Sequence, residues 1–249
     1  MSFNDHTEFI REILIWKFAS FPIALPSKPY IPDIIPEEDK RALEKYSGGG
    51  RVGFGKKPAL LIIDMTNAFV QDQYPAGFAK TGLPCARAIR TLANDCREAQ
   101  IPVIYTRSLP PNGNVKAQMG RWLDKSKGGL SSPEANEIFE ELAPQQGDMI
   151  IEKAKGSAFF GTQLESILNC LEVDTLFVTG MITSGCVRAT VFDAFAYNYR
   201  VVVPEECVAD RSQISHKVNL FDMDSKYADV MKLTDVVGWI KSHLITVKT

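Results

Sequence analysis

The chain has 249 residues, of which 45% are hydrophobic and 23% are charged, a balance typical of a soluble globular protein. Its formal net charge of -2 provides no basic excess, which argues against binding to nucleic acid or to an anionic membrane surface. The apolar stretch 12–25 is too short to cross a membrane and is interrupted by Lys17 and Pro22. Five cysteines without a CxxC pair or zinc spacing favour free thiols in a reducing, cytoplasmic compartment.

The first 50 residues differ in composition from the remainder, and we expect them to form an N-terminal arm. Residues 6–18 carry apolar side chains at helical spacing, and the prolines from Pro22 to Pro36 keep the following stretch extended. A short helix is predicted from Pro36 to about Tyr46. The apolar content is too high for a disordered tail, so the arm is expected to wrap over the domain at 51–249 or over a neighbouring subunit.

Downstream of the arm, apolar runs typical of buried parallel strands alternate with segments of helical spacing. The predicted strands are 58–64, 101–106, 149–152, 176–179, 200–203 and 227–231. The predicted helices are 83–99, 134–142, 162–171, 186–197 and 234–243. This alternation predicts an α/β fold built on a parallel sheet with right-handed crossovers.

The ends of three predicted strands carry residues that together suggest a reaction site, because ligands in open α/β sheets bind beyond the carboxyl ends of the strands. Asp64 closes the first strand, Lys153 ends the third, and Cys186 follows the fourth at the start of a helix. Asp64 is a candidate proton acceptor, Lys153 a candidate stabiliser of negative charge, and Cys186 a candidate nucleophile toward a carbonyl carbon. Backbone N–H groups of the turn 181–186 are candidates for an oxyanion hole.

Each of these residues also has a purely structural interpretation. Asp64 could equally cap a helix or a loop. Lys153 could be a solvated residue at the end of a strand, and Lys155 is a second candidate for the catalytic lysine. Cys186 is as readily one more buried cysteine in a βα turn. If it is a nucleophile, the helix N-terminus and a neighbouring lysine are expected to lower the pKa of its thiol. The joint placement at three strand ends favours the site.

Other catalytic arrangements have weaker support in the sequence. A cysteine–histidine pair would need a histidine near Cys186, and His216, well past the fifth predicted strand, is the only realistic candidate. The sequence contains no GxSxG motif for a serine hydrolase and no HExxH metal motif. We therefore prefer Asp–Lys–Cys, and we expect neither a metal nor another cofactor.

At these residues the sequence resembles the isochorismatase-like cysteine hydrolase superfamily, and within it the N-carbamoylsarcosine amidases and maleamate amidases. The resemblance runs over about residues 53–240, through GFGKKPALLIIDMTNAFV, IPVIYTR, KGSAFFGTQL, VTGMITSGCVRATVFDAF, VVVPEECVADR and HKVNLFDMDSKYADV. It implies a doubly wound, mostly parallel six-stranded sheet flanked by helices. It also implies an Asp–Lys–Cys triad, whose roles match Asp64, Lys153 and Cys186.

The resemblance extends to the residues around the nucleophile. It implies a cis peptide bond between Met181 and Ile182, which would direct the N–H groups of Ile182 and Cys186 at an oxyanion. Arg211 is similar to an arginine that holds a substrate carboxylate, and Thr183 and Asn67 would line the pocket. Trp122 is a candidate for closing the pocket because of its position in the long loop 107–146.

These observations predict a cysteine-dependent amidohydrolase that cleaves a carboxamide or N-carbamoyl C–N bond of a small carboxylate-bearing substrate. Ammonia would leave and a thioester-type intermediate would follow. The segment after the first strand lacks the metal ligands of nicotinamidases, and the resemblance implies a homo-oligomer, with a tetramer favoured. Open alternatives are maleamate or ureidoacrylate as the substrate, vinyl-ether hydrolysis of the isochorismatase type, or a non-catalytic binding or assembly protein with the same fold.

Overall fold

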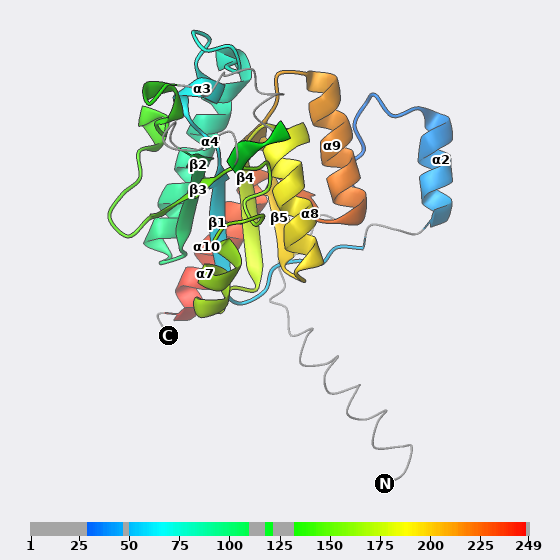
Figure 1. The fold of residues 1–249 in the computed structure, drawn as a ribbon. Helices are drawn as coiled ribbons and strands as arrows, with labels where there is room; N and C mark the ends of the chain where they lie inside the picture. Colours follow the sequence, from blue (N-terminus) through cyan, green and yellow to red (C-terminus); the bar gives the residue numbers. More distant parts are fainter. Residues whose placement is uncertain (1–28, 47–49, 110–117, 122–131, 248–249) are drawn as a thin grey trace.

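The structure is a computed structural model and describes residues 29–46, 50–109, 118–121 and 132–247 (Figure 1). The helix predicted at 6–18 lies outside the described residues. Among the described residues, no helix is long and apolar enough to cross a membrane.

A parallel sheet forms the centre of the fold, with strand order β3-β2-β1-β4-β5-β7. Its strands are β1 (Pro58–Ile63), β2 (Val103–Ser108), β3 (Met149–Lys153), β4 (Thr175–Met181), β5 (Arg200–Pro204) and β7 (Asp229–Met231). A two-residue strand, β6 (Val208–Ala209), pairs with the end of β4 and is too short to leave a pattern in the sequence. The predicted α/β class and six-stranded parallel sheet are confirmed.

Helices cover both faces of the sheet, so the fold is doubly wound. One face packs against α4 (Ala79–Glu98) and α10 (Leu233–Val247), through Leu60 and Ile62 of β1. The opposite face packs against α7 (Leu164–Cys170), α8 (Arg188–Ala196) and α9 (Gln213–Lys226), through the alternate β1 side chains. Strand β1 is buried on both sides, as its continuous apolar run predicts.

The chain order reverses between β1 and β4, because β2 and β3 extend the sheet to one side of β1 whereas β4, β5 and β7 extend it to the other. Ile63, the last residue of β1, lies between Thr106 on β2 and Gly180 on β4. A Cβ atom on Gly180 would meet the carbonyl oxygen of Ile63 at 2.0 Å, so only glycine permits this approach. The resulting crevice at the carboxyl ends of β1 and β4 is where open α/β sheets bind ligands.

Two regions differ from the sequence prediction. Helix α9 was not predicted, because its buried side includes the polar residues Asn219 and Asp224, which weaken the apolar periodicity. The single helix expected at 134–142 is wrong: the segment forms two short 3₁₀ turns, η1 (Glu134–Asn136) and η2 (Glu140–Leu142). Between them Ile138 forms an antiparallel bridge with Thr66, which explains the interruption.

The described part of the N-terminal arm packs against α9. The N–H of Tyr30 donates to Asp224 Oδ2 at 2.7 Å, and Lys217 Nζ lies 2.6 Å from Asp33 Oδ1. Helix α2 (Glu37–Tyr46) forms as predicted and stands beside α9, away from the sheet (Figure 1). The division of the chain at residue 50 stays a prediction.

Candidate active site

Asp64 follows β1 directly and is almost fully buried, with 2% of its surface exposed. Its φ angle of 51° turns the chain sharply after the strand. Oδ1 accepts a hydrogen bond from Thr106 Oγ1 at 2.7 Å, and Oδ2 accepts one from Lys153 Nζ at 2.7 Å. The carboxylate is thus bound by side chains from the two neighbouring strands β2 and β3.

Lys153 ends β3 and directs its ammonium toward this carboxylate from a buried position. A second hydrogen bond runs from its Nζ to the carbonyl oxygen of Lys155 at 2.9 Å. Burial alone would lower the pKa of Lys153, but Asp64 and Cys186 outweigh it and raise the pKa, so the side chain stays protonated. Lys155, the competing lysine, instead donates to the carbonyl oxygen of Met119 at 2.6 Å.

Cys186 lies in η3 (Thr183–Val187), a turn kinked at Gly185 (φ -119°, ψ -106°) that leads from the end of β4 into α8. Cys186 is 5% exposed, and its thiol interacts electrostatically with both Asp64 and Lys153. Burial raises the pKa of Cys186 to about 12, Asp64 adds to this effect, and Lys153 opposes it. The expected lowering of the pKa is therefore wrong, because burial beside a carboxylate outweighs the lysine. The resting group is a neutral thiol.

The turn that carries Cys186 is held by contacts on several sides. The peptide bond between Met181 and Ile182 is cis, as the resemblance implies. The N–H of Ser184 donates to Asp210 Oδ2 at 2.9 Å, and Thr190 Oγ1 donates to the carbonyl oxygen of Cys186 at 2.8 Å. These contacts fix the backbone on both sides of the thiol.

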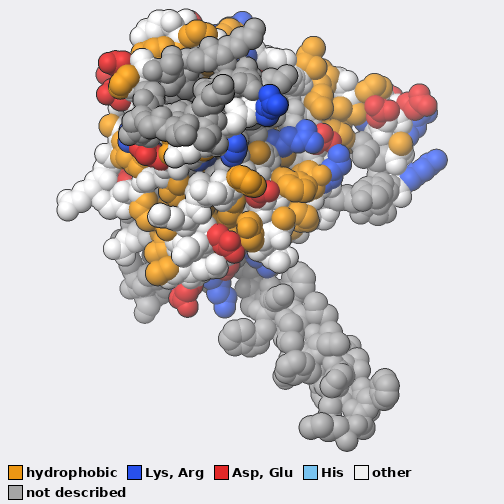
Figure 2. All heavy atoms as spheres, viewed as in Figure 1, with side chains coloured by type: hydrophobic (Ala, Val, Ile, Leu, Met, Phe, Trp, Pro, Cys, Tyr) orange, Lys and Arg blue, Asp and Glu red, His pale blue; other side chains and the backbone are white. Residues whose placement is uncertain are grey.

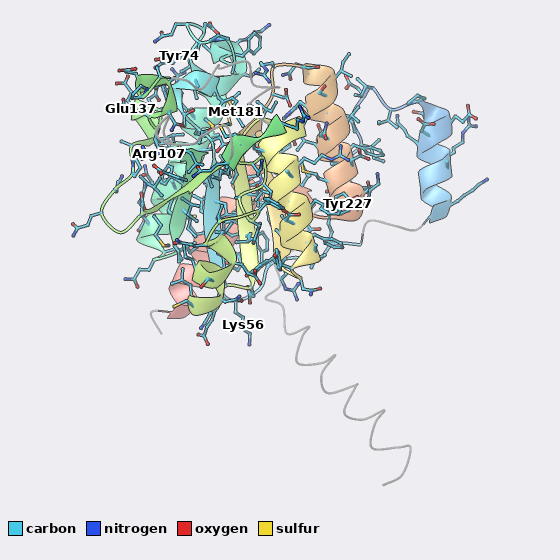
Figure 3. All side chains as sticks on the ribbon, in the orientation of Figure 1. Lys56, Tyr74, Arg107, Glu137, Met181 and Tyr227 are labelled. Atoms are coloured by element: carbon cyan, nitrogen blue, oxygen red, sulfur yellow. The ribbon has the colours of Figure 1, made fainter. Side chains whose placement is uncertain are left out.

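Figure 3 shows Met181 and Glu137 at one end of the molecule and Lys56, which precedes β1, at the other. The strands run from the Lys56 end to the Met181 end, so Asp64, Lys153 and Cys186 all lie at the carboxyl edge of the sheet. An acceptor, a cation and a thiol at this edge can transfer a proton from sulfur to carboxylate while the ammonium stabilises negative charge.

The other predicted residues lie around this centre in different roles. Thr183 is fully buried, and its Oγ1 lies 2.8 Å from His216 Nδ1. Asn67 directs its side-chain amide to the carbonyl oxygen of Glu134 at 2.8 Å. Arg211 is exposed and donates from Nη1 to the carbonyl oxygen of Ala76 at 3.0 Å. Trp122 lies outside the described residues.

His216, the alternative partner for Cys186, forms its described hydrogen bond with Thr183 and not with the thiol. Burial lowers the pKa of His216, which keeps the ring neutral at pH 7. The ring also lines a cavity of about 320 Å³ that the starts of α4 and α9 share with β6. Asp64, Lys153 and Cys186 do not line this cavity, so it lies beside the proposed reaction centre and not over it.

Thr106, near the centre, was missed by the sequence reasoning. It stands at the end of the second predicted strand, so the strand-end rule that selected Asp64 could also have found it. Asp210 follows the fifth predicted strand, but its role was not predicted, since its contact with Ser184 depends on the pairing of β6 with β4. Among the described residues, no group of three or more histidines, cysteines and acidic residues could hold a metal ion.

Comparison with known proteins identifies the family. Residues 58–235 match the Isochorismatase domain. The chain belongs to the isochorismatase family. The match begins at the first residue of β1, so the N-terminal arm lies outside it, and it includes Asp64, Lys153 and Cys186.

The chain is similar to two amidohydrolases over most of its length. It is 38% identical over 212 residues to the maleamate amidohydrolase of Pseudomonas putida, covering 82% of this chain and 96% of the relative. It is 35% identical over 197 residues to the N-carbamoylsarcosine amidase of an Arthrobacter species, covering 76% of this chain and 74% of the relative. These relatives support an enzyme that acts on non-peptide C–N bonds.

The fold itself recurs in a solved cysteine hydrolase from Pseudomonas syringae pv. phaseolicola. The two structures superpose with a TM-score of 0.70 at 23% identity, over 88% of this chain and 100% of the other. This likeness agrees with the parallel sheet and its flanking helices.

Proposed function

We propose that the protein is an amidohydrolase that cleaves a carboxamide or N-carbamoyl C–N bond of a small carboxylate-bearing substrate and releases ammonia. The observation that carries this proposal is the buried contact of Asp64 with Lys153 beside the Cys186 thiol. The names of the two relatives, a maleamate amidohydrolase and an N-carbamoylsarcosine amidase, support the substrate class.

The reaction begins with a neutral thiol, because the pKa of Cys186 is raised to about 12. As Sγ forms a bond to the carbonyl carbon, Asp64 accepts the thiol proton. Lys153 stays cationic and stabilises the negative charge that passes from the carboxylate to the sulfur and the oxyanion. The backbone N–H groups of Ile182 and Cys186 are assigned to the oxyanion.

Collapse of the tetrahedral intermediate breaks the C–N bond, and Asp64 returns its proton to the leaving nitrogen, which departs as ammonia. Water then attacks the thioester, with Asp64 as the general base, and the thiol is regenerated along with a carboxylic acid. A carbamoyl substrate would release carbon dioxide after this step. The same carboxylate therefore acts twice, first on the thiol and then on the water.

We also assign Arg211 to the carboxylate of the substrate. Its guanidinium is exposed and has one described hydrogen bond, to the carbonyl oxygen of Ala76. A guanidinium in this state can offer its remaining N–H groups to a carboxylate. Arg211→Met should raise KM for an acidic amide much more than KM for a neutral one.

The function is tested by measuring ammonia release from maleamate, N-carbamoylsarcosine, ureidoacrylate, further N-carbamoyl amino acids and simple amides. We expect turnover of at least one carboxylate-bearing amide. When hydroxylamine competes with water for the covalent intermediate, a carboxamide substrate should give a hydroxamate and an N-carbamoyl substrate an N-hydroxyurea. Ammonia release without either product would argue against the covalent intermediate. Failure on every carboxylate-bearing amide would overturn the proposed substrate class.

Two other functions are weaker. Vinyl-ether hydrolysis of the isochorismatase type does not require the cysteine, so a complete Asp–Lys–Cys arrangement gives no reason to prefer it. A binding or assembly protein with this fold would have no need for a buried ion pair beside a thiol. Either alternative would gain support if the amide panel showed no turnover.

We also propose a cytoplasmic homo-oligomer, with a tetramer as the favoured state. Large apolar side chains on and beside α8 are exposed, namely Phe160 (65%), Phe192 (50%), Phe195 (44%) and Tyr197 (49%). Figure 2 shows hydrophobic side chains gathered over the position of α8. Such a patch is typical of a surface that a second copy covers. The variant Phe192→Asp should shift the mass measured by light scattering toward a smaller species, and an unchanged mass would exclude this surface.

A further inference from the structure

Two buried polar atoms next to the triad have no hydrogen-bond partner among the described residues: Thr66 Oγ1 and Asn136 Oδ1. Thr66 is 1% exposed and Asn136 is 4% exposed. A buried polar atom without a partner is rare in native proteins, and it usually has a ligand, a water or a functional reason. Both atoms therefore need an explanation.

Thr66 stands two residues after Asp64, and its N–H donates to the carbonyl oxygen of Asp64 at 2.7 Å. It occupies the N-cap position of α3 (Asn67–Val70), where a threonine hydroxyl ordinarily accepts from a backbone N–H of the helix. Here the hydroxyl makes no capping bond. The side chain is thus buried beside the proposed general base without serving the helix that it precedes.

Asn136 has a fixed orientation because of its one described side-chain bond. Nδ2 donates to the carbonyl oxygen of Ser108 at 2.7 Å. Since a carbonyl oxygen can only accept, the amide nitrogen must face Ser108, and Oδ1 is left as an acceptor. Ser108 is the last residue of β2 and pairs with Lys153, so this acceptor lies at the same sheet edge as the triad.

Thr66 Oγ1 and Asn136 Oδ1, the two atoms without a partner, belong to neighbouring segments. The bridge between Thr66 and Ile138, and the hydrogen bond from the N–H of Asn67 to the carbonyl oxygen of Glu137 at 3.0 Å, bind the 136–138 segment beside the chain that follows Asp64. Other buried side chains at this edge are already paired, as Thr106 is with Asp64. Among the described residues, Thr66 Oγ1 and Asn136 Oδ1 are the buried side-chain polar atoms without a partner, and both belong to segments next to Asp64 or to the end of β2.

We propose that Thr66 Oγ1 and Asn136 Oδ1 bind the nitrogen of the scissile amide and so select a primary amide over an ester. This inference rests on the proposed function. In that mechanism the leaving nitrogen must lie near Asp64, because it takes its proton from that carboxyl group. An NH₂ group presents two donors, an ester oxygen presents none, and buried acceptors left unpaired by an ester would disfavour it. Both residues act by positioning the nitrogen.

The variant Thr66→Val tests this inference most cleanly, because valine has the shape of threonine without the hydroxyl. On the amide that the wild type hydrolyses, maleamate or N-carbamoylsarcosine, kcat/KM should fall about 10-fold or more. The melting temperature should stay the same or rise, since an orphan hydroxyl contributes nothing to folding. Thr66→Ser should restore most of the loss. Thr91→Val, on the exposed side of α4, is the matched control and should behave as the wild type.

An amide-to-ester comparison separates nitrogen binding from general damage to the site. With monomethyl maleate in place of maleamate, Thr66→Val and Asn136→Ala should each change kcat/KM less than 3-fold. In a Cys186→Ala background, both variants should weaken binding of maleamate measured by calorimetry but not binding of the ester. This binding comparison decides the question if the ester is not turned over.

Equal losses on amide and ester, or full amide activity in Thr66→Val, would overturn the inference while leaving the proposed amidohydrolase intact. If the wild type turned over no amide and the Cys186→Ala protein bound maleamate no better than its ester, the inference would fall together with the proposed function. A fall in melting temperature in Thr66→Val would show that the hydroxyl has a structural partner, and it would also overturn the inference.

Discussion

Two buried clusters of carboxylates and cations differ in what their carboxylates bind. Within the described residues, the Asp64 carboxylate accepts its hydrogen bonds from the side chains of Thr106 and Lys153, and it acts electrostatically on the Cys186 thiol. Asp224 and Asp229 contact the Arg51 side chain, but they also accept several backbone N–H groups. The N–H of Gly53 donates to Asp229 at 2.7 Å and that of Val230 to Asp224 at 2.8 Å.

The difference shows why a buried ion pair does not by itself mark an active site. In the Arg51 cluster, the carboxylate oxygens of Asp224 and Asp229 accept backbone hydrogen bonds that join the N-terminal segment to α9 and β7. This cluster therefore has a structural role. The Asp64 cluster lies after a strand end, beside a thiol, with two unpaired acceptors nearby. Variants of the two clusters should therefore separate loss of catalysis from loss of stability.

The largest expected effect is on catalysis. Asp64→Asn cannot accept the thiol proton, so ammonia release should fall about 10³-fold or more, which corresponds to about 4 kcal/mol of transition-state stabilisation. Steady-state kinetics on the amide that the wild type hydrolyses measures this loss. Asp224→Asn is the matched control, a buried ion-paired aspartate outside the site, and its kcat per folded molecule should stay within about 3-fold of the wild type. Similar losses in both variants would remove the distinction between the clusters.

The reverse pattern is expected for folding. Asp224→Asn removes the charge of the carboxylate nearest to Arg51 Nη1 in the described part of the chain, whereas Asp229 Oδ1 lies 3.8 Å from this nitrogen. Breaking such a pair should lower the free energy of unfolding by about 3 kcal/mol, measured by urea denaturation. A change below about 1 kcal/mol would mean that this cluster contributes as little as a surface pair.

The reactivity of the thiol gives a smaller but specific effect. Because the pKa of Cys186 is raised to about 12, its alkylation by iodoacetamide should be slow at pH 7 and should still be rising with pH at pH 10. Mass spectrometry of digested protein follows the residue against the exposed Cys170. A rate for Cys186 that levels off below pH 8 would show a stabilised thiolate and would contradict Asp64 as the proton acceptor.

The smallest effect concerns the pH dependence of stability. Burial raises the pKa of Asp229 above its usual 3.8, so the folded protein holds this proton to higher pH than the unfolded chain does. Its contribution to stability is greatest at low pH and falls as the pH rises upward from 3.8. In Asp229→Asn this slope should be absent, which urea denaturation at pH 4 to 6 can measure. An unchanged slope would assign the pH dependence to other groups.

The sequence predicted the parallel strands well, because β1 and β4 are continuous apolar runs bounded by polar turns. The strand ends also located the candidate site, since Asp64 directly follows β1, Lys153 ends β3, and Cys186 lies in the turn between β4 and α8. Helix α9 escaped prediction because Asn219 and Asp224 on its buried side hide the periodicity. The direction of the Cys186 pKa shift was predicted wrongly, because the depth of burial depends on packing between elements distant in sequence.

Thr66 and Asn136 show a further limit of sequence reasoning. A threonine before a helix indicates a cap, and an asparagine in a loop indicates a turn. That their polar atoms are buried without partners emerges only when β1, β2 and the 134–138 segment are assembled. Residues of this kind are recognised by checking whether each buried polar atom has a hydrogen-bond partner, and a sequence motif does not reveal them.

The central claim is that Cys186 is the nucleophile of an amidohydrolase. The most direct test is the rate of ammonia release by Cys186→Ala, beside Cys170→Ala as a control for loss of an exposed thiol. The substrates are maleamate and N-carbamoylsarcosine. We predict that Cys170→Ala keeps the wild-type rate and that Cys186→Ala falls to the uncatalysed background while remaining folded. A folded Cys186→Ala protein that still releases ammonia at the wild-type rate would contradict the claim.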